Sequence, residues 1–320
     1  MSLPNLCSVK TLFLCLTLCM TSYTHAVQQE KESSPAADKT TQTAESKTPE
    51  QQSVEANKQT SDPVEKSATL APPIKFLQQQ HDDIKHYLEP DIINSILVGM
   101  KEHVLLISLN KTGIAKGVVI LLPDWQQGAT SSKALNHLRL QFPKQGWTTI
   151  AIQPPAKPDN YPSIAIDHDK QIEFNQKALT DYQNDLAEVL KQVTEKANEY
   201  PGIIVTISEG SNAALLTNIY HQELVAAPSA LVLLSSFLPT AEANKMVAES
   251  ISQLAMPVLD LTLFRDNIYV NNAAQLRSDA VKQEMKPHYR QKQLHNINPN
   301  YYPKAMLLKE INGWLAAIGW

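Results

Sequence analysis

The stretch Ile203-Ile204-Val205-Thr206-Ile207-Ser208-Glu209-Gly210-Ser211-Asn212-Ala213 decides the fold of this chain. An apolar, β-branched run reaches a sharp turn and a helical pattern follows at once, so we expect a strand, a turn and a helix in succession. That order is typical of the nucleophile elbow of hydrolases, whose pattern is G-x-S-x-G. Ser208 and Asn212 take the glycine positions, and Gly210 takes the position of the nucleophile. Glycine has no side chain that could attack a substrate. The stretch therefore predicts the fold of a hydrolase but does not indicate which reaction, if any, the protein catalyses.

Apolar runs alternate with helical patterns along the rest of the chain. We expect strands at 104–109, 118–122, 147–152, 203–207, 231–234, 258–263 and 289–294, and helices at 75–88, 131–145, 176–198, 211–225, 241–254 and 270–285, with a last helix opening at Pro303. We expect the first two strands to form a hairpin around the turn at 110–113. The alternation predicts an α/β fold of α/β-hydrolase type: a mostly parallel sheet with an N-terminal hairpin, helices on both faces and no large cap domain.

The N-terminus has the pattern of a secretory signal peptide. Lys10 precedes an apolar run from Leu12 to Met20, and Thr24-His25-Ala26 offers small residues for cleavage, which we place after Ala26. The run is shorter than the roughly 20 apolar residues that span a bilayer. We therefore expect a periplasmic or secreted protein with no transmembrane segment in the mature chain.

All three cysteines, Cys7, Cys15 and Cys19, lie inside this signal. The mature chain would then have no disulfide, thiolate metal site or cysteine nucleophile. Lipidation of Cys19 is an alternative, although the bulky Leu18 precedes it where a small residue is preferred.

Residues 27–73 have a different composition from the rest. They contain no glycine and no aromatic residue, and Gln, Lys, Glu, Ser, Thr, Ala and Pro dominate. Such a segment buries too little apolar surface to offset its ordering entropy, so we expect a disordered linker. An alternative is that this tail docks on a partner in the cell envelope. The remainder, 74–320, is long enough for one large α/β domain.

Charge and motifs exclude several classes of function. The chain has 28 Lys and Arg against 32 Asp and Glu, with no basic stripe, so nucleic acid is a poor candidate for a partner. No phosphate-binding loop, dinucleotide fingerprint or His-Glu-x-x-His motif occurs, and we expect no cofactor. His81, His86 and His103 do not have the spacing of a metal site.

The chain resembles a known family in a series of short motifs. They are Gly117-Val118-Val119-Ile120-Leu121-Leu122-Pro123, Gly146-Trp147-Thr148-Thr149-Ile150-Ala151-Ile152-Gln153-Pro154, Glu209-Gly210-Ser211, Pro257-Val258-Leu259-Asp260, Tyr289-Arg290-Gln291 and Gly313-Trp314-Leu315. In this order they are similar to the secreted bacterial α/β-hydrolase-like proteins of the DUF3530 type, a family named only as a domain of unknown function. The resemblance implies the fold and an envelope location, and it implies no reaction.

A serine hydrolase of this fold needs a nucleophile, an acid and a base in that chain order. The candidates are Ser211, next to the apex, Asp266, just past the strand 258–263, and His295, at the end of the last strand. Asp260 and His288 are alternatives for the acid and the base. Each has a plainer interpretation: Ser211 caps the helix, Asp266 belongs to a turn and His295 lies on the surface.

The segment after strand 118–122 is unusual for an oxyanion hole. Pro123 has no N–H to donate, and a carboxylate at Asp124 would repel a developing oxyanion. We expect Asp124, Trp125, Glu209 and Gly210, with Ser211, to line one pocket at the carboxyl ends of the strands, where open α/β sheets bind ligands. The alternative is that Asp124 caps the loop and Trp125 packs in the core.

Two hypotheses about function follow. The first is a degenerate hydrolase retained for binding or scaffolding in the envelope, with an unknown small molecule or envelope component as its partner. The second is an active esterase or amidase that uses Ser211, Asp266 and His295.

Overall fold

The computed structural model describes residues 74–320, and in this range eight strands form a single mixed sheet. The strands are β1 (Ile93–Val98), β2 (Lys101–Ser108), β3 (Gly117–Leu122), β4 (Trp147–Ile152), β5 (Ile203–Glu209), β6 (Ala230–Leu234), β7 (Val258–Leu263) and β8 (Tyr289–Leu294). Their order across the sheet is β1-β2-β4-β3-β5-β6-β7-β8. Strands β3 to β8 run parallel, and β1 and β2 are antiparallel. The fold is α/β-hydrolase-like, as predicted.

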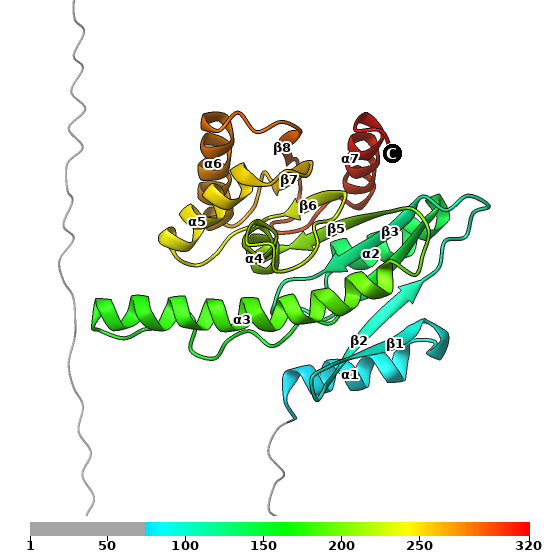
Figure 1. The fold of residues 1–320 in the computed structure, drawn as a ribbon, viewed down its shortest axis with the longest axis horizontal. Coiled ribbons are helices and arrows are strands. Elements are labelled where there is room, and N and C mark those ends of the chain that lie inside the picture. The colour runs from blue at the N-terminus through cyan, green and yellow to red at the C-terminus, as the bar shows by residue number, and fades with distance from the viewer. Residues whose placement is uncertain (1–73) are drawn as a thin grey trace, which may run out of the picture. The chain divides into compact units, whose positions relative to one another are not determined.

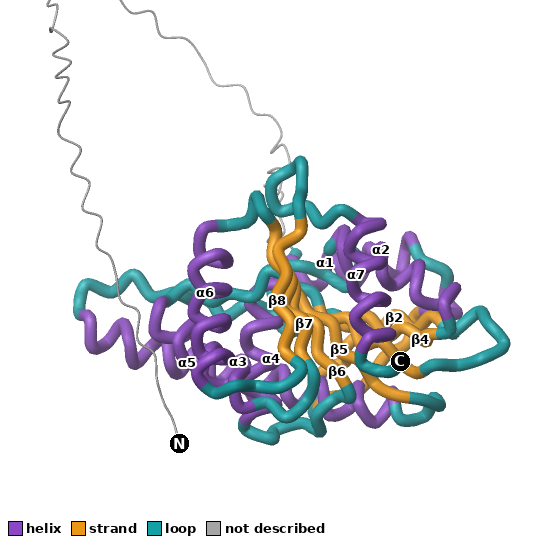
Figure 2. Tube along the Cα trace, turned by 90° about the horizontal axis from the view of Figure 1, so that it is seen from above, coloured by secondary structure: helices purple, strands orange, loops and turns teal. Residues whose placement is uncertain are grey.

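Helices cover both faces of this sheet (Figure 2). They are α1 (Phe76–Tyr87), α2 (Lys133–Gln141), α3 (His168–Ala197), α4 (Gly210–His221), α5 (Ala241–Gln253), α6 (Ile268–Gln283) and α7 (Lys304–Ala317), with short 3₁₀ turns at Pro90–Ile92 and Phe142–Gln145. Helices α3 to α6 pack on one face, and α1, α2 and α7 pack on the other. The sheet is therefore buried between two apolar layers, as the continuous apolar runs of β3 and β6 require.

The predicted hairpin of strands 104–109 and 118–122 is wrong. Strand β4 lies between β2 and β3, and the N-terminal hairpin is instead β1 with β2. The two strands join through Gly99-Met100, where Gly99 takes a φ of 60°. A two-residue turn with positive φ matches the right-handed twist of the strands, so the register of the hairpin is set there.

Helix α3 is longer than its apolar periodicity indicates (Figure 1). It begins at His168 instead of residue 176, because the Asp167 side chain accepts the backbone N–H groups of Asp169 and Lys170. Its first buried residue is Leu179. The turns before it do not pack in the core, so their sequence shows no apolar periodicity from which a helix could be predicted. The predicted signal peptide and linker lie outside the described residues, and the domain boundary near 74 stays a prediction.

Candidate functional site

The elbow forms where β5 ends at Glu209 and α4 begins at Gly210, with no residue between them. Gly210 has a φ of +64°, a conformation that costs a side-chain-bearing residue about 1–2 kcal/mol. A Cβ atom at this position would lie 2.6 Å from Oδ1 and 2.7 Å from Cγ of Asp124. The apex space that holds the nucleophile in an active hydrolase is therefore filled by the Asp124 side chain.

Asp124 follows β3 and also takes the neighbouring backbone donor. Its Oδ1 accepts the N–H of Ser211 at 2.7 Å. In α/β-hydrolases the N–H of the residue after the nucleophile stabilises the oxyanion. Burial raises the pKa of Asp124, opposed by hydrogen bonds from Ser211 and by the N–H of Trp125. The Ser211 N–H, which a substrate oxyanion would need as a hydrogen-bond donor, thus already donates to the Asp124 carboxyl group.

Two buried side chains fix the loop that carries Asp124. The Asn212 amide donates to the Pro123 carbonyl at 2.7 Å, and the Tyr182 hydroxyl donates to Oδ1 of Asn212 at 2.9 Å. Trp125 is buried and packs edge-to-face against Tyr182, with 5.5 Å between the ring centroids. Asp124 and Trp125 therefore point to different surroundings, one to the elbow and the other to the core.

Asp124, Glu209 and Gly210 line one cavity of about 190 Å³ at the carboxyl ends of the strands. Its other lining residues are Gln127, Ser235, Phe237, Asp266, Asn267, Val270, Asn300 and Tyr302. Trp125 and Ser211 are not among them, and Ser211 is only 2% exposed. Sequence reasoning missed Ser235 and Tyr302, which come from loops without periodicity.

The candidate triad is not brought together. Asp266 accepts the Ser235 hydroxyl at 2.6 Å and the Leu263 N–H at 3.0 Å. His295 is exposed, and its ring lies 5.5 Å from the ring of Phe264. Among residues 74–320, no hydrogen bond or ion pair joins Ser211, Asp266 and His295 to one another.

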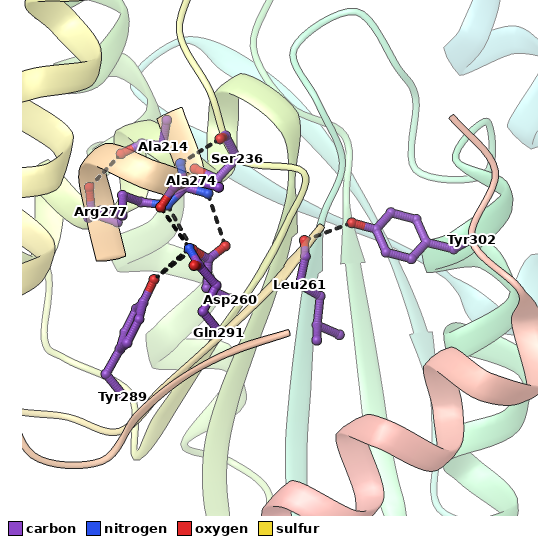
Figure 3. Close-up of polar contacts among 10 residues, drawn as sticks. Ala214, Ser236, Asp260, Leu261, Ala274, Arg277, Tyr289, Gln291 and Tyr302 are labelled. Carbon is purple, nitrogen blue, oxygen red and sulfur yellow. Dashed lines mark hydrogen bonds and ion pairs between the residues drawn. The ribbon is translucent and has the colours of Figure 1, made fainter. Parts of the chain in front are cut away.

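The alternative acid and base lie elsewhere. His288 precedes β8 at the amino edge of the sheet, opposite the elbow. Asp260 lies within β7, fully buried, where it pairs with Arg277 of α6 and accepts hydrogen bonds from Tyr289 and Gln291 (Figure 3). A carboxylate with this many internal partners stabilises the packing of α6 on the sheet.

Glu209 is the most perturbed carboxyl group of the cavity. Burial, followed by the negative charges of Asp124 and Asp266, raises its pKa to about 7, while the Ser132 hydroxyl, 2.5 Å from Oε2, opposes the shift. The Glu209 carboxyl group is thus partly protonated near neutral pH. Within residues 74–320, this cavity included, no group of three His, Cys, Asp or Glu side chains is arranged to hold a metal ion.

Replacing Glu209 with glutamine should remove a pH dependence of stability. The folded protein holds a proton on Glu209 that the unfolded chain releases between pH 4.5 and 7, so stability falls as pH rises through that window. We expect Glu209→Gln to match the wild type near pH 4.5 and to exceed it by about 3 kcal/mol at pH 8. Urea denaturation at both pH values measures this. Glu195→Gln, on the exposed side of α3, is the matched control. The prediction is contradicted if the free energy of unfolding of Glu209→Gln changes with pH as much as that of the control.

The sequence matches the family described as "Protein of unknown function (DUF3530)" over residues 9–171 and 165–317. The chain belongs to the DUF3530 family. The family thus accounts for nearly the whole of the described fold, including the elbow and the Asp124 loop. No curated protein sequence matches this chain.

Solved structures similar to this DUF3530 protein are α/β-hydrolases. Thermogutta terrifontis esterase 2, phosphoramylated by tabun, matches with a TM-score of 0.52 and 12% identity over 72% of this chain and 97% of the esterase. A putative dienelactone hydrolase from Klebsiella pneumoniae matches with a TM-score of 0.50 and 12% identity over 70% of this chain and 97% of the hydrolase. At this identity the likeness establishes the fold alone. In the described part of the chain, no helix has the length and apolar character needed to cross a membrane.

Proposed function

We propose that this chain is an exported, non-catalytic α/β-hydrolase-fold protein that binds a ligand at the carboxyl edge of its sheet. The observation that carries the proposal is the position of Asp124, which occupies both the apex space and the Ser211 N–H. Oxyanion stabilisation requires donors that are free when charge develops on the substrate. A carboxyl group that already holds such a donor, beside a glycine apex, favours binding without covalent chemistry.

The surroundings of Ser211 support the same proposal. A serine becomes a nucleophile when a base lies within hydrogen-bond reach, about 2.6–3.2 Å. Within residues 74–320 no hydrogen bond joins Ser211 to a histidine, its N–H is held by Asp124, and Ser211 itself is only 2% exposed. The rival hypothesis of an active esterase therefore requires both the loop after β3, which carries Asp124, and the loop after β8, which carries His295, to rearrange.

Export rests on the sequence. The basic residue, the apolar run and the small residues before Ala26 are the pattern that secretory signal peptides share. A binding protein in the periplasm or outside the cell fits this pattern, with its ligand drawn from the cell envelope.

Turnover of short p-nitrophenyl esters tests the proposal. We expect rates within about twofold of the uncatalysed reaction, because neither an apex nucleophile nor a free oxyanion donor is present. Ser211→Ala should leave these rates unchanged. Turnover that Ser211→Ala abolishes, in a variant that remains folded, would establish the esterase instead.

A further inference from the structure

The cavity at the elbow is one half of a longer groove. A second hollow of about 290 Å³ adjoins it, and both are lined by Gln127, Glu209, Asn300 and Tyr302. The second hollow adds residues from the starts of α2 and α7, among them Ser131, Lys133 and Lys304. A ligand longer than either hollow can therefore lie across the shared residues.

The two halves of this groove carry opposite charge. Asp124, Glu209 and Asp266 line the elbow half, which no Lys, Arg or His lines. Lys133 and Lys304 line the other half, where Glu209 is the sole carboxylate. Within residues 74–320 neither lysine forms an ion pair. The Lys133 ammonium instead donates to the Tyr301 hydroxyl at 2.8 Å.

Two helix ends add to the positive half. Lys133 and Lys304 are the first residues of α2 and α7, whose N-termini carry partial positive charge. No side chain caps α7, so its first N–H groups have no side-chain acceptor. An anionic group placed between the two lysines would meet both ammonium groups and this uncapped helix end.

An unpaired polar atom lies between the halves. The side-chain oxygen of Gln127 is buried and has no hydrogen-bond partner in the described structure, although Gln127 lines both hollows. A buried acceptor without a partner is unfavourable, and a ligand N–H that reaches it would supply the missing hydrogen bond. The groove thus offers an acceptor in its middle, carboxylates at one end and ammonium groups at the other.

We propose that this groove binds a short peptide with free termini. Its ammonium group lies against Asp124, Glu209 and Asp266, its carboxylate lies between Lys133 and Lys304, and a peptide N–H donates to Gln127. This inference rests on the proposed function, since it names the ligand of the same non-catalytic site. Each terminal group forms charge-assisted contacts, so blocking either terminus should weaken binding.

Isothermal titration calorimetry of the full mature chain at pH 8 tests this inference with an alanine series from the single amino acid to penta-alanine. We expect an oligopeptide to bind more tightly than alanine, and N-acetylation or C-amidation each to weaken binding at least tenfold. The proposal is overturned if no peptide binds, if blocking a terminus leaves affinity unchanged, or if free alanine binds as tightly as the oligopeptides.

Two variants locate the termini. Lys304→Met should weaken binding of the free peptide at least tenfold and leave the C-amidated peptide unaffected, whereas Lys309→Met, on the same helix but outside the groove, should change neither. Glu209→Gln should weaken binding of the free peptide at least tenfold and leave binding of the N-acetylated peptide unaffected. Equal losses for blocked and free peptides would contradict the assigned ends.

Mass spectrometry of the titrated peptide separates this inference from the proposed function. Recovery of intact peptide with no binding defeats the inference and leaves the non-catalytic proposal standing. Binding with the expected sensitivity to both termini, followed by cleavage of the peptide, supports the assigned ends and defeats the non-catalytic proposal.

Discussion

Arg277→Met should lower the free energy of unfolding by about 3–5 kcal/mol, the largest effect we expect from a single substitution. Both Arg277 and Asp260 are fully buried, and the guanidinium group donates to the two carboxylate oxygens of Asp260 at 2.8 and 3.1 Å and to the Ser236 carbonyl at 2.7 Å. Removing the arginine leaves a buried carboxylate with only Tyr289 and Gln291 as donors (Figure 3). Urea denaturation measures the loss.

Two controls separate the ion pair from a general effect of losing an arginine. Arg290→Met, at an exposed position on β8, should stay within about 0.5 kcal/mol of the wild type. The double variant Asp260→Leu/Arg277→Met removes both charges and should be at least about 1 kcal/mol more stable than Arg277→Met alone. A double variant that is no more stable than Arg277→Met would contradict the assignment of the loss to an uncompensated charge.

Gly210→Ser should destabilise the protein by about 2–4 kcal/mol and should not create an esterase. The cost combines a side chain at positive φ, about 1–2 kcal/mol, with displacement of Asp124 from the Ser211 N–H. Activity stays absent because no histidine lines this cavity, so the new serine has no imidazole base beside it. Denaturation and ester turnover on the same preparation measure both effects.

A double-mutant cycle with Asp124→Ala shows whether the clash is the cause. Truncating Asp124 opens the space next to position 210, so Gly210→Ser should cost at least about 1 kcal/mol less in that background. Additive losses would mean that the backbone conformation, and not the Asp124 side chain, sets the cost. Strong esterase activity from Gly210→Ser alone would disprove our account of the oxyanion side.

The sheet was predictable because its central strands are buried on both faces. Strands β3 and β6 consist entirely of buried residues, and such strands are continuous apolar runs in the sequence. Strand β1 escaped prediction because it lies at the edge of the sheet and includes polar residues such as Asn94 and Ser95. Without β1, the pairing of β2 could not be assigned correctly.

The site was predictable only where local sequence sets local geometry. Gly210 and Asp124 each directly follow an apolar strand or the proline after one, so their place at the carboxyl edge could be inferred from the pattern. Ser235 and Asn300 take positive φ values in irregular loops, and no periodicity describes their path to the cavity. The pairing of Asp260 with Arg277 likewise depends on how α6 packs, which the sequence does not display.

Intact-mass spectrometry after exposure to a fluorophosphonate probe tests the central claim most directly. The probe phosphonylates an activated serine whatever the natural substrate, so the result does not depend on the choice of ester. With Gly210 at the apex and Asp124 on the Ser211 N–H, we expect the mass of the folded protein to stay unchanged. A stoichiometric adduct on Ser211, lost in the Ser211→Ala variant, would contradict the account.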